Sequence, residues 1–437
     1  MAEGMQISRI QAREILDSRG YPTIEVFLAL ADGTTAIAGV PAGASTGRHE
    51  AVERRDGDVG RYQGRGVLKA VDNVVEVIAP ALMGMRADDQ RGIDSALLML
   101  DGTSTKENLG ANAILGVSLA CARAAARSGG VELYQYLGGA QARILPMPMF
   151  NVLNGGKHAR NGSDIQEFKL IPVGAETFRE ALRFGAEAYH ALHDILCEGG
   201  ASALVGDEGG FAPSLTTNSA YLDLLMQAIE RAGYRPGEQI AIGVDAAATT
   251  FCNGGTYALQ RDGQLLSTCE MIEYWVDWLR RYPIVSLEDP LDEDDWMGFQ
   301  SITSRVGNRV QIVGDDLFVT NREFLQKGIE MGCCNCILIK PNQVGTVTET
   351  MDAVRAAQAA SYACMVSHRS GETQDTSIAD LAVALNCGQL KAGAPARGER
   401  VAKYNRLLQI EDKLGSRGVF AGRLAVPKRE HPFAFVS

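Results

Sequence analysis

The chain has 437 residues, of which 46% are hydrophobic and 22% are charged, values ordinary for a globular protein with two or three domains. Its net charge of −11 argues against a nucleic acid held through phosphate contacts, whereas a small anionic substrate needs only a local cationic pocket. Residues 1–8 lack the apolar core of a signal peptide, and the uncharged run 109–122 is shorter than the roughly 18 residues that a membrane helix needs. Nine cysteines without paired spacing indicate free thiols, which are typical of the reducing cytoplasm. Together these observations lead us to expect a cytoplasmic protein with no membrane or nucleic-acid partner.

The first part of the chain reads as three strands followed by helices. Residues 7–16 and 23–30 alternate apolar and polar side chains, and a third strand is expected over 34–40. Helical patterns then cover 67–80, 90–100 and 109–128. This order predicts an α+β N-terminal domain, residues 1–140, that caps the rest of the chain. Its small-residue loop, Pro41 to Gly47, suits an active-site lid, although composition alone favours a plain turn.

After Pro146 and Pro148 the chain alternates strand-like and helix-like runs, which predicts a C-terminal β/α (TIM-like) barrel over residues 141–437. Four apolar, β-branched runs in this part each end on an ionisable residue. The runs are 240–244, 284–287, 310–314 and 336–339, and they precede Asp245, Glu288, Asp315 and Lys340. Such runs are typical of buried parallel strands, whose carboxyl ends form the active-site face of a barrel. The three acids are hard oxygen ligands that suit Mg²⁺.

Further polar residues stand in short motifs. Glu208 lies in a glycine-rich run, 206–211, and Glu167 stands at the head of a strand-like run. The run 367–372 combines a cation with two hydroxyls and can hold a phosphate, with Arg369 as a fork-shaped donor. Lys391 follows another strand-like run. Each signal alone is weak, and a single histidine such as His158 is more often structural than catalytic.

Six motifs together resemble enolase, and the resemblance runs collinearly from about residue 7 to residue 422. They are Asp17-Ser18-Arg19-Gly20, Gly43-Ala44-Ser45-Thr46-Gly47, the run 206–211, Ser286-Leu287-Glu288-Asp289-Pro290, Gly314-Asp315-Asp316-Leu317 and the run 367–372. The resemblance implies dehydration of 2-phosphoglycerate to phosphoenolpyruvate in glycolysis, with two Mg²⁺ ions per active site. It also implies a small phosphorylated anion as substrate and a homodimer or larger homo-oligomer.

The resemblance also implies a role for each matching position. Lys340 is similar to the general base and Glu208 to the general acid, with Glu167 and His158 beside them. The positions similar to substrate-binding residues are Gln166, His368, Arg369, Ser370 and Lys391. The positions similar to metal ligands are Asp245, Glu288, Asp315 and, from the lid, Ser45.

The chemistry explains this set of residues. Removing a proton next to a carboxylate adds negative charge, which metal ions stabilise, as is general for the enolase superfamily. Lys340 must be neutral to act as a base, so we expect nearby Lys391 and the metal to depress its pKa. Glu208 must be protonated to release water, so we expect the charge of Glu167 to raise its pKa.

Several positions depart from the usual enolase sequence. Ala42 and Ala392 stand where the family has hydroxyl side chains, Tyr21 replaces an asparagine, and Lys157 adds a charge beside His158. The changes at Ala42, Lys157 and Ala392 keep open an enolase paralogue of phosphonate or phosphinate biosynthesis, of the carboxyphosphonoenolpyruvate synthase type. A binding protein without turnover is a third hypothesis, but the presence of the acid–base residues argues against it.

Overall fold

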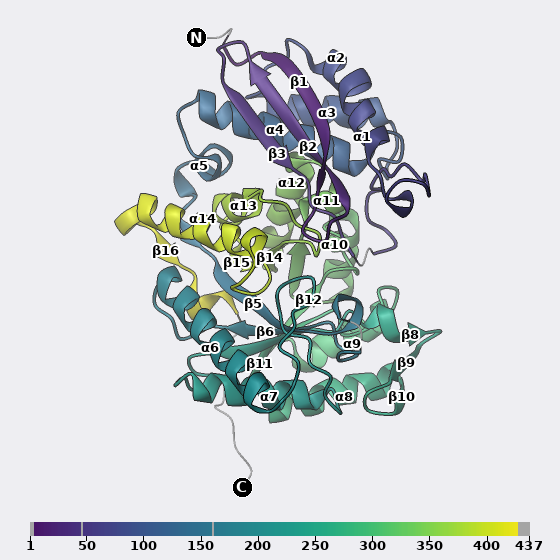
Figure 1. Cartoon of the computed structure of the whole chain (residues 1–437), viewed down its shortest axis with the longest axis vertical. Helices are drawn as coiled ribbons and strands as arrows, with labels where there is room; N and C mark the ends of the chain where they lie inside the picture. Colours follow the sequence, from purple (N-terminus) through teal and green to yellow (C-terminus); the bar gives the residue numbers. More distant parts are fainter. Residues whose placement is uncertain (1–3, 45–46, 160, 427–437) are drawn as a thin grey trace.

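The computed structural model describes residues 4–44, 47–159 and 161–426, which form an α+β part and a barrel (Figure 1). The N-terminal sheet is antiparallel with the order β1-β2-β3. Its strands are β1 (Ile7–Leu16), β2 (Pro22–Leu30) and β3 (Thr35–Gly39). The alternating pattern therefore predicted all three strands correctly.

Helices follow the sheet in the predicted order. They are α1 (Leu68–Asp72), α2 (Ala79–Leu82), α3 (Gln90–Asp101), α4 (Ala111–Ser128) and α5 (Leu133–Gly138). The helix predicted over 67–80 is irregular, because a π-helical stretch, Asn73–Ile78, joins α1 to α2.

Helix α4 carries the uncharged run of the sequence. Its residues from Ala111 to Ala122 are all buried, and the helix packs against β2 and β3. A Cβ atom at Gly116 would lie 2.6 Å from Val26 Cγ2, so glycine allows this close approach of helix and sheet. The run is thus a core helix, and within the described residues no helix is both long and apolar enough to cross a membrane.

The second part is a closed eight-stranded barrel, as predicted, with the strand order β11-β12-β13-β14-β15-β5-β6-β7. Its strands are β5 (Met147–Asn154), β6 (Glu167–Ile171), β7 (Ala241–Asp245), β11 (Ile284–Glu288), β12 (Gln311–Gly314), β13 (Cys336–Ile339), β14 (Ala363–Ser367) and β15 (Gly388–Lys391). The predicted fold class, an α+β domain followed by a barrel, is confirmed. The division at residues 140 and 141 stays a prediction.

One strand corrects the expectation of an all-parallel barrel. Strand β6 is antiparallel to both of its neighbours, β5 and β7. The connection from β5 to β6 contains a short 3-10 turn, Gly156–His158, and no crossover helix, so the chain turns back on itself. As a result, the beginning of β6 meets the carboxyl ends of the other strands.

Helices surround the barrel (Figure 1). They are α6 (Phe178–Glu198), α7 (Ser219–Arg231), α8 (Thr268–Arg281), α9 (Trp296–Val306), α10 (Arg322–Met331), α11 (Pro341–Val344), α12 (Val347–Ala359), α13 (Ser377–Ala384) and α14 (Gly398–Leu414). A small three-stranded sheet stands between β7 and α8, formed by β8 (Cys252–Asn253), β9 (Thr256–Leu259) and β10 (Gln264–Ser267). A two-stranded pair, β4 (Ile144–Leu145) and β16 (Val419–Phe420), joins the two ends of this part.

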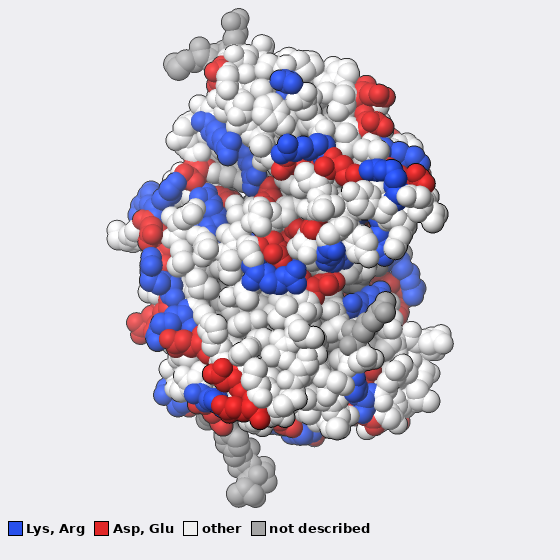
Figure 2. All heavy atoms as spheres, in the orientation of Figure 1, with Lys and Arg blue, Asp and Glu red and all other residues white. Residues whose placement is uncertain are grey.

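Positive and negative side chains are interspersed on the face drawn in Figure 2. That face shows no extended patch of a single charge. A long anionic polymer would need an extended positive patch. Of the C-terminal tail, residues 424–437, the structure describes only the part up to Val426. Leu424 is exposed, but Val426 is buried among apolar side chains of the barrel interior, so this first piece of the tail is packed rather than free.

Candidate active site

The ionisable residues predicted at strand ends meet at one mouth of the barrel. Asp245, Glu288 and Lys391 are the last residues of β7, β11 and β15, while Asp315 and Lys340 directly follow β12 and β13. All five are buried. Parallel strands present their carboxyl ends at the same edge, so residues far apart in sequence become neighbours.

Glu167 reaches the same mouth from the opposite direction. It is the first residue of antiparallel β6, and it pairs in register with Asp245. Burial raises the pKa of Glu167 to about 8. The charges of Glu208 and Glu288 act in the same direction, and the attraction of Lys391 only partly opposes them. Burial and the adjacent Glu288 likewise raise the pKa of Asp245 to about 8.

Two lysines neutralise part of this acidic cluster. Lys391 Nζ lies 2.7 Å from Glu288 Oε1, 3.1 Å from Glu167 Oε2 and 3.3 Å from Asp245 Oδ2. Lys169 Nζ lies 2.5 Å from Glu288 Oε2. Burial acts against the ionised form of Glu288, but the two ammonium groups outweigh it and lower its pKa. Our sequence analysis missed Lys169; its spacing of two residues from Glu167 in one strand, which puts both on the same face, was the available signal.

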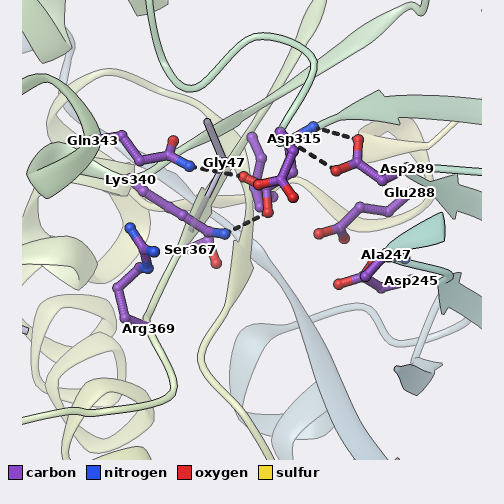
Figure 3. A network of polar contacts seen from close by, with 12 residues as sticks. Gly47, Asp245, Ala247, Glu288, Asp289, Asp315, Lys340, Gln343, Ser367 and Arg369 are labelled. Carbon is purple, nitrogen blue, oxygen red and sulfur yellow. Dashed lines mark hydrogen bonds and ion pairs between the residues drawn. The ribbon is translucent and has the colours of Figure 1, made fainter. Parts of the chain in front are cut away.

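Asp315 and Lys340 form a buried ion pair (Figure 3). Gln343 Nε2 also donates to Asp315 Oδ1 at 3.1 Å, and the Asp315 amide donates to Asp289 Oδ1 at 2.9 Å. Burial favours a neutral Lys340, yet the charge of Asp315 outweighs burial and raises the lysine pKa. Lys391 does act to lower the pKa of Lys340, as expected, but the attraction of Asp315 is larger, so the expected net decrease is wrong for the protein groups by themselves.

Glu208 accepts hydrogen bonds from two side chains: Asn151 Nδ2 at 2.9 Å and His368 Nε2 at 3.1 Å. Arg400 donates to His368 Nδ1 at 2.7 Å, so this nitrogen carries no proton and Nε2 is the donor to Glu208. Burial lowers the pKa of His368 to about 4, which agrees with a neutral ring.

The pKa of Glu208 also differs from our expectation. Burial disfavours its charged form, but His158, His368 and Arg400 outweigh burial and hold the pKa well below its ordinary value. His158 Nε2 lies 3.6 Å from Glu208 Oε1. The predicted increase is wrong because these neighbours, and not Glu167, dominate the surroundings of Glu208. Glu167 is the carboxyl whose pKa is raised.

The residues predicted to hold a phosphate, Arg369 and Ser370, lie beside the lid. Arg369 donates to both carboxylate oxygens of Glu50, at 2.8 and 3.2 Å, a partner that our sequence analysis missed. Ser370 Oγ accepts a hydrogen bond from the Ala44 amide at 2.8 Å. Ser45, the predicted lid ligand, lies outside the described residues. Ser370 and Arg369 line one cavity together with the predicted acid–base and substrate residues His158, Gln166, Glu167, Glu208, Lys340, His368 and Lys391.

Comparisons with known proteins match this architecture over nearly the whole chain. The family description "Enolase, N-terminal domain" matches residues 7–137, and "Enolase, C-terminal TIM barrel domain" matches residues 142–429. A curated enolase from Beutenbergia cavernae is 57% identical over 422 residues, which are 97% of this chain and 99% of that protein. The chain belongs to the enolase family.

The carboxylates of this enolase family member fit divalent metal ions. Oxygens of Glu167, Asp245 and Glu288 lie within 4.8 Å of one another, and so do those of Asp289, Asp315 and Asp316. Hard, buried oxygen donors are what Mg²⁺ prefers. Of the three predicted ligands, Asp245 and Glu288 lie together, while Asp315 belongs to the adjacent group. Burial and the neighbouring Glu288 raise the pKa of Asp245, and a bound divalent cation would favour its ionised form.

The two alanines that depart from the usual enolase sequence are not among the residues that line the cavity. Ala42 and Ala392 are fully buried, and Ala392 belongs to the main apolar core. The Ala42 backbone pairs with Gly371, through hydrogen bonds of 2.7 and 2.9 Å. Lys157 is exposed and lies on the loop beside His158. These departures therefore leave the buried polar groups of the enolase site unchanged.

Proposed function

We propose that the protein dehydrates 2-phosphoglycerate to phosphoenolpyruvate, the enolase reaction of glycolysis. The observation that carries this proposal is the placement of a lysine and a carboxyl group in one cavity on opposite sides of the barrel. Lys340 follows β13, whereas the Glu208 loop is bridged through Phe211 to Leu153 in β5, three strands farther around the barrel. A proton and a leaving hydroxide can thus be handled by different residues.

The protein groups suggest the following division of roles. Lys340 removes the proton from the carbon next to the substrate carboxylate. Glu208 donates a proton to the departing hydroxyl group, and His158 and Glu167 lie beside it. Arg369 and Ser370 hold the phosphate end, and Gln166, His368 and Lys391 face the rest of the substrate. Gln166 Oε1 and His158 Nδ1 are buried without a hydrogen-bond partner, as expected for groups that meet a ligand.

The protonation states of the protein alone match the hydration direction of this reversible reaction. Lys340 is charged because of Asp315, and Glu208 is ionised. Dehydration requires Lys340 to lose its proton and Glu208 to gain one. Any cation that neutralises Asp315 weakens its ion pair with Lys340 and lowers the lysine pKa, and an anionic substrate beside Glu208 raises the pKa of the carboxyl.

Two Mg²⁺ ions per site complete the proposal, with Asp245, Glu288 and Asp315 as ligands of one and lid residue Ser45 as a ligand of the second. When bound, they would stabilise the extra negative charge that forms on the substrate carboxylate. The protein itself supplies a buried, oxygen-lined site that holds these ligands in place before substrate arrives.

The decisive experiment is turnover of 2-phosphoglycerate, followed by the absorbance of the enol product. The alternative paralogue of phosphonate or phosphinate biosynthesis is not favoured, because the 57% identical relative carries the name enolase and the departing alanines are buried in the core. Negligible turnover of 2-phosphoglycerate, with efficient use of a phosphonate or phosphinate analogue, would reverse this assignment.

We also propose a cytoplasmic homodimer or larger homo-oligomer. The nine cysteines are free thiols, which suits a reducing compartment. Light scattering coupled to size-exclusion chromatography tests the oligomer, and a monomeric mass would contradict it.

A further inference from the structure

His158 and Glu208 stand on loops, and neither belongs to a barrel strand or directly follows one. Asp245, Glu288 and Lys391 end barrel strands, whereas His158 ends the 3-10 turn between β5 and β6. Glu208 lies in the irregular stretch between α6 and α7. The positions of these two side chains therefore depend on what holds their loops.

The Glu208 loop has several fixed points of its own. Tyr189 Oη donates to Gly209 O at 2.8 Å, and Arg400 donates to Asp207 O at 3.0 Å. The Ala394 amide donates to Glu208 O at 3.0 Å. Three separate segments thus anchor this loop next to its carboxyl residue.

The His158 loop has a different kind of support. Among the described residues, the hydrogen bonds that reach 156–162 from outside the loop 155–165 all come from Arg261. Its Nε donates to Gly162 O at 2.8 Å, and its guanidinium also donates to Asn161 O. Within the loop, the Gly156 amide donates to Ser163 O at 2.8 Å. Ser163 and Asp164 are bonded in turn to Asn218, so Asn218 holds the base of the loop and the Arg261 guanidinium holds its outer part.

Arg261 connects this loop to the segment that follows Glu208. A second guanidinium nitrogen donates to Leu215 O at 2.9 Å and a third contact reaches Ser214 Oγ at 3.3 Å. The residue stands in the turn between β9 and β10, and the adjacent Asp262 accepts hydrogen bonds from Tyr274 Oη at 2.8 Å and Asn218 Nδ2 at 3.0 Å. The turn is therefore fixed to helix α8 and can serve as a rigid support.

We propose that Arg261 is a positioning residue that sets the distance between His158 and Glu208 by fastening the His158 loop to the segment after Glu208. The fork of the guanidinium suits this task, because it donates in several directions at once. His158 Nδ1 has no hydrogen-bond partner, and the nearest carboxylate oxygens lie at 3.6 Å (Glu208) and 4.0 Å (Glu167), too far for a hydrogen bond that would replace the support of the loop. The inference rests on the proposed function only for its kinetic readout.

A double-mutant cycle tests this inference. Because small misplacements of positioned groups are costly, we expect Arg261→Ala to lower kcat/KM on 2-phosphoglycerate on the order of 10- to 100-fold. His158→Ala should cost at least as much. If Arg261 acts through His158, the double variant should be no slower than His158→Ala alone. Independent, multiplying effects would overturn the proposal. Arg305→Ala, which removes an exposed arginine that pairs with Glu273, is the control and should keep wild-type kinetics.

Hydrogen exchange supplies a readout that needs no activity. In Arg261→Ala, amides of 156–159 and 161–162 should exchange faster, while amides of 207–210 should keep their wild-type rates because their anchors remain. Equal exchange of 156–159 and 161–162 in both proteins would overturn the proposal, even if the wild type failed to turn over 2-phosphoglycerate. If the alanine variant does not fold, Arg261→Lys replaces it, because lysine keeps the charge but not the forked guanidinium. It should show the same pattern at smaller amplitude. Unchanged exchange and kinetics in Arg261→Lys would contradict the role of the guanidinium.

Discussion

Lys391 Nζ lies 2.7 Å from Glu288 Oε1 in the fully buried floor of the mouth. The same ammonium group also contacts carboxylates at the end of β7 and the start of β6, so one lysine joins carboxylates from three strands. Burying several carboxylates is costly unless cations compensate them. This ion pair therefore links the stability of the barrel mouth to the chemistry that takes place there.

Replacing Lys391 with methionine should strongly destabilise the protein. Removing one partner of a buried ion pair leaves an uncompensated charge, which costs about 3–5 kcal/mol in the free energy of unfolding. Urea unfolding in EDTA measures the change. Lys413→Met is the matched control, since Lys413 is half-exposed in its pair with Glu132 and should change stability by no more than about 1 kcal/mol. Similar losses for both variants would contradict a special role for the buried pair.

Binding of Mg²⁺ should release protons near neutral pH. The pKa values of Asp245 and Glu167 are raised to about 8. At pH 7 the proposed ligand Asp245 therefore holds a proton that a metal ion must displace, and the charge of the metal also favours loss of the proton from neighbouring Glu167. Apparent Mg²⁺ affinity should therefore rise with pH up to about 8 and then level off. Calorimetry at pH 7 in two buffers with different ionisation enthalpies measures the protons released, and a heat that does not depend on the buffer would refute the prediction.

Substitutions of Lys340 and Glu208 should separate the two chemical steps. Lys340→Ala should slow exchange of the substrate α-proton with solvent by about 10²–10⁴-fold, the usual contribution of a general base. Glu208→Gln should retain this exchange but lose dehydration. Proton NMR in heavy water follows the exchange, with Lys327→Ala, which changes an exposed lysine, as a control. Exchange at the wild-type rate in Lys340→Ala would place the base elsewhere.

Restoring the family hydroxyls at the two buried alanines should not change substrate choice. Ala42→Ser with Ala392→Thr buries two hydroxyl groups in packed surroundings, at a cost of about 1–3 kcal/mol each if they find no partner. We expect a lower melting temperature, while the wild type and the double variant both use 2-phosphoglycerate with kcat/KM of at least ~10⁴ M⁻¹s⁻¹. A gain in activity from a nearly inactive wild type would instead favour the paralogue hypothesis.

The sequence by itself determined the barrel, the N-terminal sheet and the residues that meet at the mouth. These features are local: buried strands need apolar runs, and the charged residues Asp245, Glu288 and Lys340 stand where such runs end. The family motifs then added the residues on loops, among them Glu208 and His158.

The tertiary structure decided what depends on neighbours distant in sequence. The direction of β6 follows from a connection without a helix, and it turns Glu167 and Lys169 toward the mouth. The pKa of Glu208 is low and that of Lys340 is high because His368, Arg400 and Asp315 surround them, although each comes from another part of the chain. The contacts of Arg261 with two loops likewise exist only in the folded chain. Electrostatic interactions and hydrogen bonds depend on distances between side chains, and only folding sets those distances.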